Sequence, residues 1–151
     1  MTIRTIQRRQ KVAWPIERVF GFFANAGNLD RLTPPWLNFQ VRTPQPITMQ
    51  AGARIEYTIR WRGLPIRWLT EIEEWTPGKR FVDVQVRGPY RLWHHTHRFE
   101  AVRDETVLED EVRYALPLGP IGDCAHSLLV RRDVEEIFDF RAQQIHELMG
   151  L

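Results

Sequence analysis

The sequence predicts an α+β fold in which a curved antiparallel sheet of six or seven strands wraps around one long C-terminal helix. Between residues 37 and 116, short alternating segments follow one another and are separated by turn residues, which is typical of an antiparallel meander. Residues 127–149 instead carry apolar side chains at helical spacing, and a helix of about 23 residues is roughly 35 Å long. A sheet with one buried face needs a cover, and we expect this helix to provide it.

Two short helices are predicted between a first strand, at residues 2–13, and the meander. Pro15 suits the first turn of a helix that ends near residue 24. The second helix covers residues 27–32 and is stopped by the Thr-Pro-Pro run at 33–35. The apolar residues that give the first helix its spacing are Ile16, Val19, Phe20 and Phe23.

The meander has its clearest two-residue period at residues 53–62, where apolar and polar side chains alternate. One face of this strand is therefore predicted to be buried. The Pro- and Gly-rich run at 117–122 is expected to connect the last strand to the helix, at one mouth of the space between them. The other strands are predicted at 39–43, 66–75, 80–87, 90–102 and 106–116, with turns at 63–65, 77–78, 88–89 and 103–105.

The composition is that of one globular domain spanning residues 1–151. A hydrophobic share of 43% is ordinary for a folded protein. The 21 basic and 19 acidic residues nearly balance, so the pI near 9.0 does not by itself indicate nucleic acid binding. A local basic cluster near the N-terminus is interpreted as a solvated edge strand, phosphate binding being the alternative. Its members are Arg4, Arg8, Arg9 and Lys11.

The sequence further indicates a cytoplasmic protein. The single cysteine, Cys124, excludes an internal disulfide and fits a reducing compartment. Residues 1–10 lack the apolar core of a signal peptide, and no stretch approaches the roughly 18 apolar residues needed to span a bilayer. We expect a soluble protein without an integral membrane segment, whose exposed first strand could pair with a second copy in a weak homodimer.

Polar residues that periodicity places on buried faces are the candidates for function. Alternation with Trp93 and Phe99 puts His95 and His97 on the inner face of the 90–102 strand. Asp110 falls on the inner face of the next strand by the same argument. For residues 80–87 the alternation does not decide which side chains face inward. They are either Val82, Val84 and Val86 or Phe81, Asp83, Gln85 and Arg87.

The terminal helix carries a cation inside its apolar stripe. Arg141 lies between Phe138 and Ile145, and a bare buried charge costs several kcal/mol. An ion pair with Asp110 or Asp83 is favoured over a catalytic role. His126 lies on the same stripe if the helix begins near residue 123.

The two strand histidines have three interpretations. They are core residues satisfied by Asp110, or they line a ligand pocket, or they join Asp110 or His126 in a metal site, the least favoured interpretation. Most of the tryptophans are interpreted as core, with pocket walls a close second. These are Trp61, Trp68, Trp75 and Trp93; Trp36, beside Pro34 and Pro35, reads as an exposed lid or a plug.

Motifs for other chemistry are missing from the sequence. No nucleophile with an arranged base, GxGxxG run, phosphate loop or CxxC pair occurs. We therefore expect neither a cofactor nor a metal ion.

Two stretches carry a resemblance to a known family: RFVDVQVRGPYRLWHHTHRFE at 80–100 and PLGPIGDCAHSLLVRRDVEEIFDFR at 117–141. With the order of elements, they make the chain similar to the START-like, or SRPBCC, superfamily with its helix-grip fold, and more narrowly to its bacterial ligand-binding subgroup. Polyketide cyclases, ubiquinone-binding START proteins and birch-pollen-allergen-like proteins belong to this superfamily. The resemblance implies a deep cavity between sheet and helix. It also implies that Asp83 and Gln85 form one polar cluster with His95 and His97.

The expected function is the binding of a small hydrophobic or aromatic molecule, lipid-, quinone- or polyketide-like, in that cavity, without a nucleic acid partner. The alternative is a cyclase or dehydratase that acts on an aromatic or polyketide-like substrate with a cavity histidine. A protein–protein interaction role with a fully packed core is a third interpretation. The predicted ligand-binding residues are Tyr57, Trp68, Asp83, Gln85, Trp93, His95, His97, Asp110, Tyr114, Phe138 and Arg141, with Phe99 as a further cavity wall.

Overall fold

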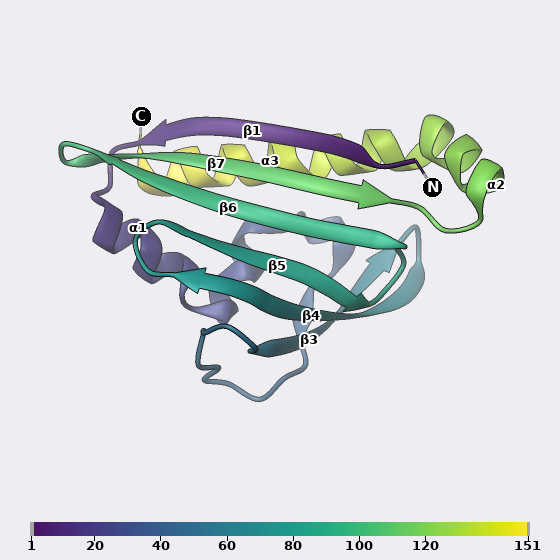
Figure 1. Ribbon diagram of the computed structural model, residues 1–151, viewed down its shortest axis with the longest axis horizontal. Coiled ribbons are helices and arrows are strands. Elements are labelled where there is room, and N and C mark those ends of the chain that lie inside the picture. The colour runs from purple at the N-terminus through teal and green to yellow at the C-terminus, as the bar shows by residue number, and fades with distance from the viewer. Residues whose placement is uncertain (1, 151) are drawn as a thin grey trace.

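The computed structural model describes residues 2–150, and within them seven antiparallel strands form one curved sheet with the helices on its inner side (Figure 1). The strand order is β1-β7-β6-β5-β4-β3-β2, so the meander runs from one edge while the first strand closes the other. The strands are β1 (Arg4–Val12), β2 (Gln40–Val41), β3 (Arg54–Trp61), β4 (Leu64–Thr76), β5 (Arg80–Arg87), β6 (Leu92–Val102) and β7 (Glu105–Ala115). The helices are α1 (Ile16–Phe23), η1 (Ala26–Leu32), η2 (Pro35–Leu37), α2 (Gly119–Ala125), η3 (His126–Val130) and α3 (Arg131–Met149).

The predicted strands and short helices are confirmed, with small differences at their ends. The second short helix is a 3-10 helix, and a further 3-10 turn, η2, follows it. The turn between β3 and β4 is shorter than predicted, because Arg62 and Gly63 both adopt positive φ, +51° and +84°. Such a two-residue turn matches the twist of a hairpin. It therefore lets β4 begin at Leu64.

The helix at the C-terminal end begins earlier than residue 127. Helical backbone starts at Gly119 in α2, passes through a π-helical turn, η3, and continues as α3 to Met149. Part of the run predicted as a connection is thus helical. Pro120 permits this because it lies in the first turn of α2, where a backbone N–H has no helical partner to lose. Leu118, in the left-handed region at φ +71°, makes the bend before it.

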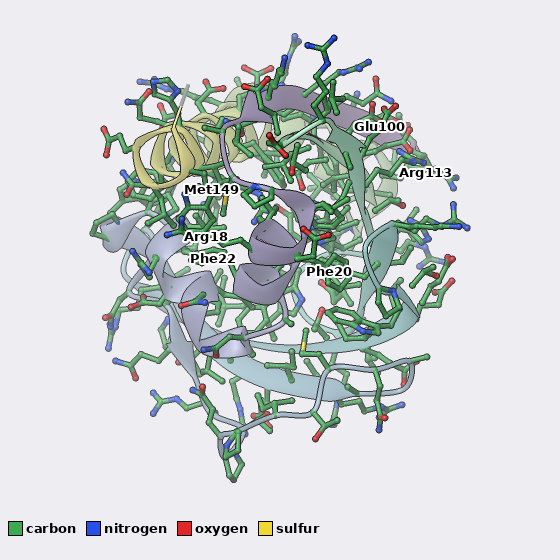
Figure 2. All side chains as sticks on the ribbon, turned by 90° about the vertical axis from the view of Figure 1, so that its left-hand side faces the viewer. Arg18, Phe20, Phe22, Glu100, Arg113 and Met149 are labelled. Carbon is green, nitrogen blue, oxygen red and sulfur yellow. The ribbon has the colours of Figure 1, made fainter. Side chains whose placement is uncertain are left out.

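The helices α1 and α2 lie at the two ends of the sheet, and the long helix runs between them (Figure 1). Figure 1 shows α3 running along β1 and β7, with α1 and α2 at opposite ends of the sheet. At the α1 end, Phe20 and Phe22 lie near the last turn of α3, where Met149 is buried (Figure 2). They belong to a hydrophobic cluster that also contains Phe99, so this residue is part of the core. Across residues 2–150, no helix is both long and apolar enough to pass through a membrane.

Candidate functional site

A cavity of about 410 Å³ lies between the sheet and the C-terminal helix. Its volume falls within the range of small-molecule sites. From α3, Asp133, Ile137 and Arg141 line it at intervals of four residues, which places them on one face of the helix. Aromatic side chains form much of the opposite wall. Among them are Phe39, Tyr57, Trp61, Trp68, Tyr90 and Trp93.

The cavity opens beside α2. Leu118 and Ile121 line it and are nevertheless 74% and 72% exposed, so they border both the interior and solvent. This agrees with the expectation that residues 117–122 lie at a mouth. Asp133 lies near this mouth, and Arg141 lies eight residues further along the helix, at the inner end of the cavity. At 1.5 Å per residue, the mouth and the inner end are therefore about 12 Å apart along α3.

A carboxylate on α3 ties the β3–β4 hairpin to the helix near the mouth. Asp133 is 9% exposed and accepts hydrogen bonds from Trp61 Nε1 at 2.7 Å and from Arg62 Nη2 at 3.2 Å. The sequence reasoning missed Asp133. It lies two turns before Arg141 on the same stripe, so its position among apolar residues was the signal that could have found it.

The inner end of the cavity is polar and is organised by Asp110 on β7. Arg141 Nε donates to Asp110 Oδ2 at 3.0 Å, and Arg141 Nη2 donates to Oδ1 at 3.3 Å. His95 Nε2 lies 2.8 Å from Asp110 Oδ1. Burial by itself would raise the pKa of Asp110, but the Arg141 charge and the hydrogen bond to His95 together hold it well below its usual range. Asp110 is therefore an ionised carboxylate that carries the buried guanidinium.

A second carboxylate, Asp83 on β5, pairs with His97. Their Oδ2 and Nε2 atoms are 2.6 Å apart, and His97 Nδ1 lies 3.3 Å from Arg141 Nη2. Burial, with the neighbouring His95 adding to it, lowers the pKa of His97 to about 4, so its ring is neutral near pH 7. Burial acts to raise the pKa of Asp83, yet the two histidines outweigh it and lower that pKa.

The network assigns the ring protons. Because Arg141 Nη2 can only donate, neutral His97 accepts with Nδ1 and donates to Asp83 with Nε2. In its neutral form His95 donates to Asp110 with Nε2 and keeps a lone pair on Nδ1. That Nδ1 is 3.7 Å from Asp83 Oδ2, too far for a hydrogen bond. Two acceptors, His95 Nδ1 and the Asp83 carboxylate, therefore remain at the cavity.

Asp83, His95 and His97 are also the group of described residues that could hold a metal ion. Each offers one donor atom, and these atoms lie within 4.8 Å of one another. The hydrogen bond between His97 and Asp83 already uses two of them, and Arg141 sets a positive charge beside the pair. The arrangement thus favours a hydrogen-bonded network over a metal centre.

Most of the predicted ligand-binding residues line the cavity, and three do not. Gln85 does not belong to the expected polar cluster. Its amide bonds the backbone N and O atoms of Tyr90 instead and holds the β5–β6 turn. Asp110 bonds His95 and Arg141 but does not itself line the cavity. Tyr114 bonds His126 Nε2 at 2.8 Å, so His126 is engaged away from the strand histidines. The residues that do line the cavity are Tyr57, Trp68, Asp83, Trp93, His95, His97, Phe138 and Arg141.

Among the tryptophans that the structure describes, Trp68 is the one with a buried polar atom that lacks a partner. It lies in the wall between Tyr57, with ring centroids 5.7 Å apart, and Trp93, at 5.3 Å. Its buried Nε1–H has no acceptor among the described residues. Such a donor costs about 1–3 kcal/mol, part of which a ligand acceptor would recover. Trp75 packs against the core cluster, Trp61 lines the cavity, and Trp36 is half exposed.

Comparison with known proteins gives one family and a common fold. Residues 12–140 match the family described as polyketide cyclase / dehydrase and lipid transport. No curated protein matches the chain.

Three solved structures illustrate the common fold. Protein CV1439 of Chromobacterium violaceum has a TM-score of 0.74 at 16% identity, over 98% of this chain and 99% of that one. For a START superfamily protein of Mycobacterium smegmatis the TM-score is 0.69 at 11% identity, over 96% of both chains. The Zhui aromatase/cyclase of Streptomyces sp. R1128 gives 0.68 at 12% identity, over 99% of this chain and 100% of that one. The helix-grip architecture expected from the sequence is confirmed.

Proposed function

The chain belongs to the polyketide cyclase / dehydrase and lipid transport family, and from this membership we propose that its cavity binds one small hydrophobic or aromatic molecule of lipid-, quinone- or polyketide-like kind. The observation that carries the proposal is the cavity itself, about 410 Å³ in volume, with aromatic walls and polar groups gathered at its inner end. Specific small-molecule sites combine an apolar lining with a few placed polar groups in this way. The unsatisfied indole N–H of Trp68 adds support.

The expected affinity is moderate. A ligand that buries about 300 Å² of apolar area gains roughly 7 kcal/mol, and association removes about 4 kcal/mol or more. The remainder, at most about 3 kcal/mol, corresponds to a dissociation constant of about 6 mM or weaker. One hydrogen bond to a charged group adds about 1.5–3 kcal/mol and lowers the dissociation constant toward the micromolar range.

Fluorescence titration tests this proposal directly, because Trp68 and Trp93 lie in the cavity wall. Quinones, sterols, fatty acids and polyketide-like aromatics are titrated into the protein. We expect saturable quenching with at least one class, and mass spectrometry of the natively purified protein should find a molecule of that class. Silence across all four classes would contradict the proposal.

A second function, cyclase or dehydratase, is favoured by one specific observation. His95 is oriented by Asp110 through Nε2, and its Nδ1 lone pair is at the cavity. A histidine held in this way can act as a general base and take a proton from carbon next to a carbonyl group.

Deuterium uptake by an aromatic ketone in D₂O measures this activity. Acceleration by the wild-type protein, lost in His95→Gln although ketone binding persists, would support catalysis. Exchange at the rate of the buffer alone, with the ketone bound, would leave binding as the function.

A further inference from the structure

The polar end of the cavity presents hydrogen-bond acceptors to a ligand. We propose that it selects a ligand with a hydroxyl group, an alcohol, phenol or enol that donates a hydrogen bond to Asp83 or His95, and that it discriminates against carboxylates. This inference rests on the proposed binding function and adds to it the chemical class of the ligand's polar end. It goes against the simplest interpretation of an arginine at a cavity, which is a carboxylate anchor.

Arg141 offers no bidentate fork for such an anchor, because each fork of its guanidinium includes an engaged nitrogen and only Nη1 has no partner among the described residues. Its Nε and Nη2 atoms donate to both oxygens of Asp110, and Nη2 also faces His97 Nδ1. The Cζ atom of the guanidinium lies over the ring of Phe23, 5.3 Å from its centroid. An entering carboxylate would have to displace Asp110, an equally charged group that is held in place by β7 and by His95.

Beside Asp83 and His95, the atoms left for a ligand are acceptors. Neutral His95 carries a lone pair on Nδ1, and Asp83 Oδ2 lies 3.7 Å from that atom. A hydroxyl hydrogen placed at either atom would satisfy an acceptor that the protein leaves open. A carboxylate at the same place offers no hydrogen.

Charge works in the same direction. Asp83 and Asp110 carry two negative charges and Arg141 one positive charge, and His97 is neutral because burial lowers its pKa to about 4. The two carboxylates therefore outnumber the guanidinium at this end. Asp83 also affects the cavity wall, since its charge adds to burial in raising the pKa of Tyr57 well above the usual value. A second anion would enter against this field.

Three ligands with one carbon skeleton test the inference: naphthalene, 2-naphthol and 2-naphthoate. Each is brought to equilibrium dialysis against the full-length protein near neutral pH, after a chelator has removed metal ions. A hydrogen bond to a charged or basic acceptor predicts that 2-naphthol binds about tenfold more tightly than naphthalene. 2-Naphthoate should bind more weakly than both.

Two matched substitutions locate the selectivity. In Asp83→Asn the amide oxygen can still accept from His97, while the side chain loses its negative charge and one of its two acceptor oxygens. We expect the tenfold preference for 2-naphthol to fall toward one and the penalty on 2-naphthoate to shrink. Asp139→Asn makes the same chemical change at an exposed ion pair with Arg8 and should alter neither ratio.

The outcomes separate this inference from the proposed function. If naphthalene binds but 2-naphthoate binds as tightly as 2-naphthol, the selection of hydroxyl groups is wrong and hydrophobic binding stands. If Asp83→Asn keeps the wild-type preference, the assignment to Asp83 and His95 is wrong. If none of the three ligands binds, both proposals fail. Because the ligand series is measured on the wild-type protein, the inference is decided even if Asp83→Asn does not fold.

Discussion

His95 and Asp110 are joined across β6 and β7 by a 2.8 Å contact between Nε2 and Oδ1, and the same carboxylate receives Arg141 from α3. One side chain thus connects two neighbouring strands to the helix that covers them. Asp110 is 8% exposed and Arg141 9% exposed. The connection is therefore made away from solvent, where the loss of one partner is felt most strongly.

Asp110→Asn should lower the free energy of unfolding by about 3 kcal/mol or more, because it leaves the Arg141 guanidinium buried without its counter-charge. Urea unfolding followed by tryptophan fluorescence measures the change. Asp139→Asn, at a surface pair with Arg8, should cost less than about 1 kcal/mol. Equal effects of the two substitutions would show that Asp110 does not carry the buried charge.

Acid should destabilise the protein below about pH 6.5, a higher pH than carboxylate titration alone would require. The folded-state pKa of His97 is lowered to about 4, whereas an unfolded histidine titrates near 6.5. Between these values the unfolded chain binds more protons, so the free energy of unfolding falls as pH falls, by at most about 3 kcal/mol from this group. The lowered pKa values of Asp83 and Asp110 extend the loss to lower pH with the same sign.

His97→Gln checks the origin of this slope in urea unfolding experiments from pH 7.5 to 4. The variant should show a flatter dependence between pH 6.5 and 4, with part of the slope retained by His126, whose pKa burial also lowers. His146→Gln, on the exposed side of α3, should leave the profile unchanged. A wild-type slope in His97→Gln would assign the proton uptake to other groups.

The buried polar residues were accessible from the sequence because two periodicities fix the faces of strands and helices. Alternation along β6 and β7 placed His95, His97 and Asp110 inward, and the helical stripe placed Arg141 opposite them. An ion pair of Arg141 with Asp110 or Asp83 then followed from the need of a buried cation for a carboxylate, and the structure shows Asp110 as the partner. Periodicity assigns a face but not a partner, and this is why Gln85, bonded to Tyr90, did not join the cluster.

What the sequence did not predict depends on contacts between distant segments or on local backbone geometry. Asp133 is buried because Trp61, 72 residues away, donates to it. The Pro- and Gly-rich run at 117–122 has the composition of a loop, yet Pro120 starts a helix there. The π-helical turn η3 depends on local backbone geometry and was not predicted from the residue pattern.

Ile137→Trp should block the cavity without unfolding the protein. Ile137 is partly buried and lines the space between Asp133 and Arg141, so a larger side chain can enter the cavity volume. We expect ligand affinity to fall at least tenfold, about 1.4 kcal/mol, while the melting temperature stays the same or rises. Leu128→Trp introduces the same side chain at a position that is 72% exposed and should leave affinity unchanged. Unchanged affinity in Ile137→Trp would place the ligand elsewhere.

Asp133→Ala should loosen the mouth of the cavity, because Asp133 is the group that holds the tip of the β3–β4 hairpin to α3. The substitution removes the acceptor of the buried Trp61 N–H, which predicts a loss of about 1–3 kcal/mol in the free energy of unfolding. It should also speed ligand dissociation, measured by stopped-flow fluorescence, more than it slows association, since the hairpin no longer closes against the helix. Arg62→Ala removes only the exposed partner of the same carboxylate and should cost less than about 1 kcal/mol. If Arg62→Ala accelerates dissociation as much as Asp133→Ala does, the surface ion pair, and not the Trp61 hydrogen bond, controls the mouth.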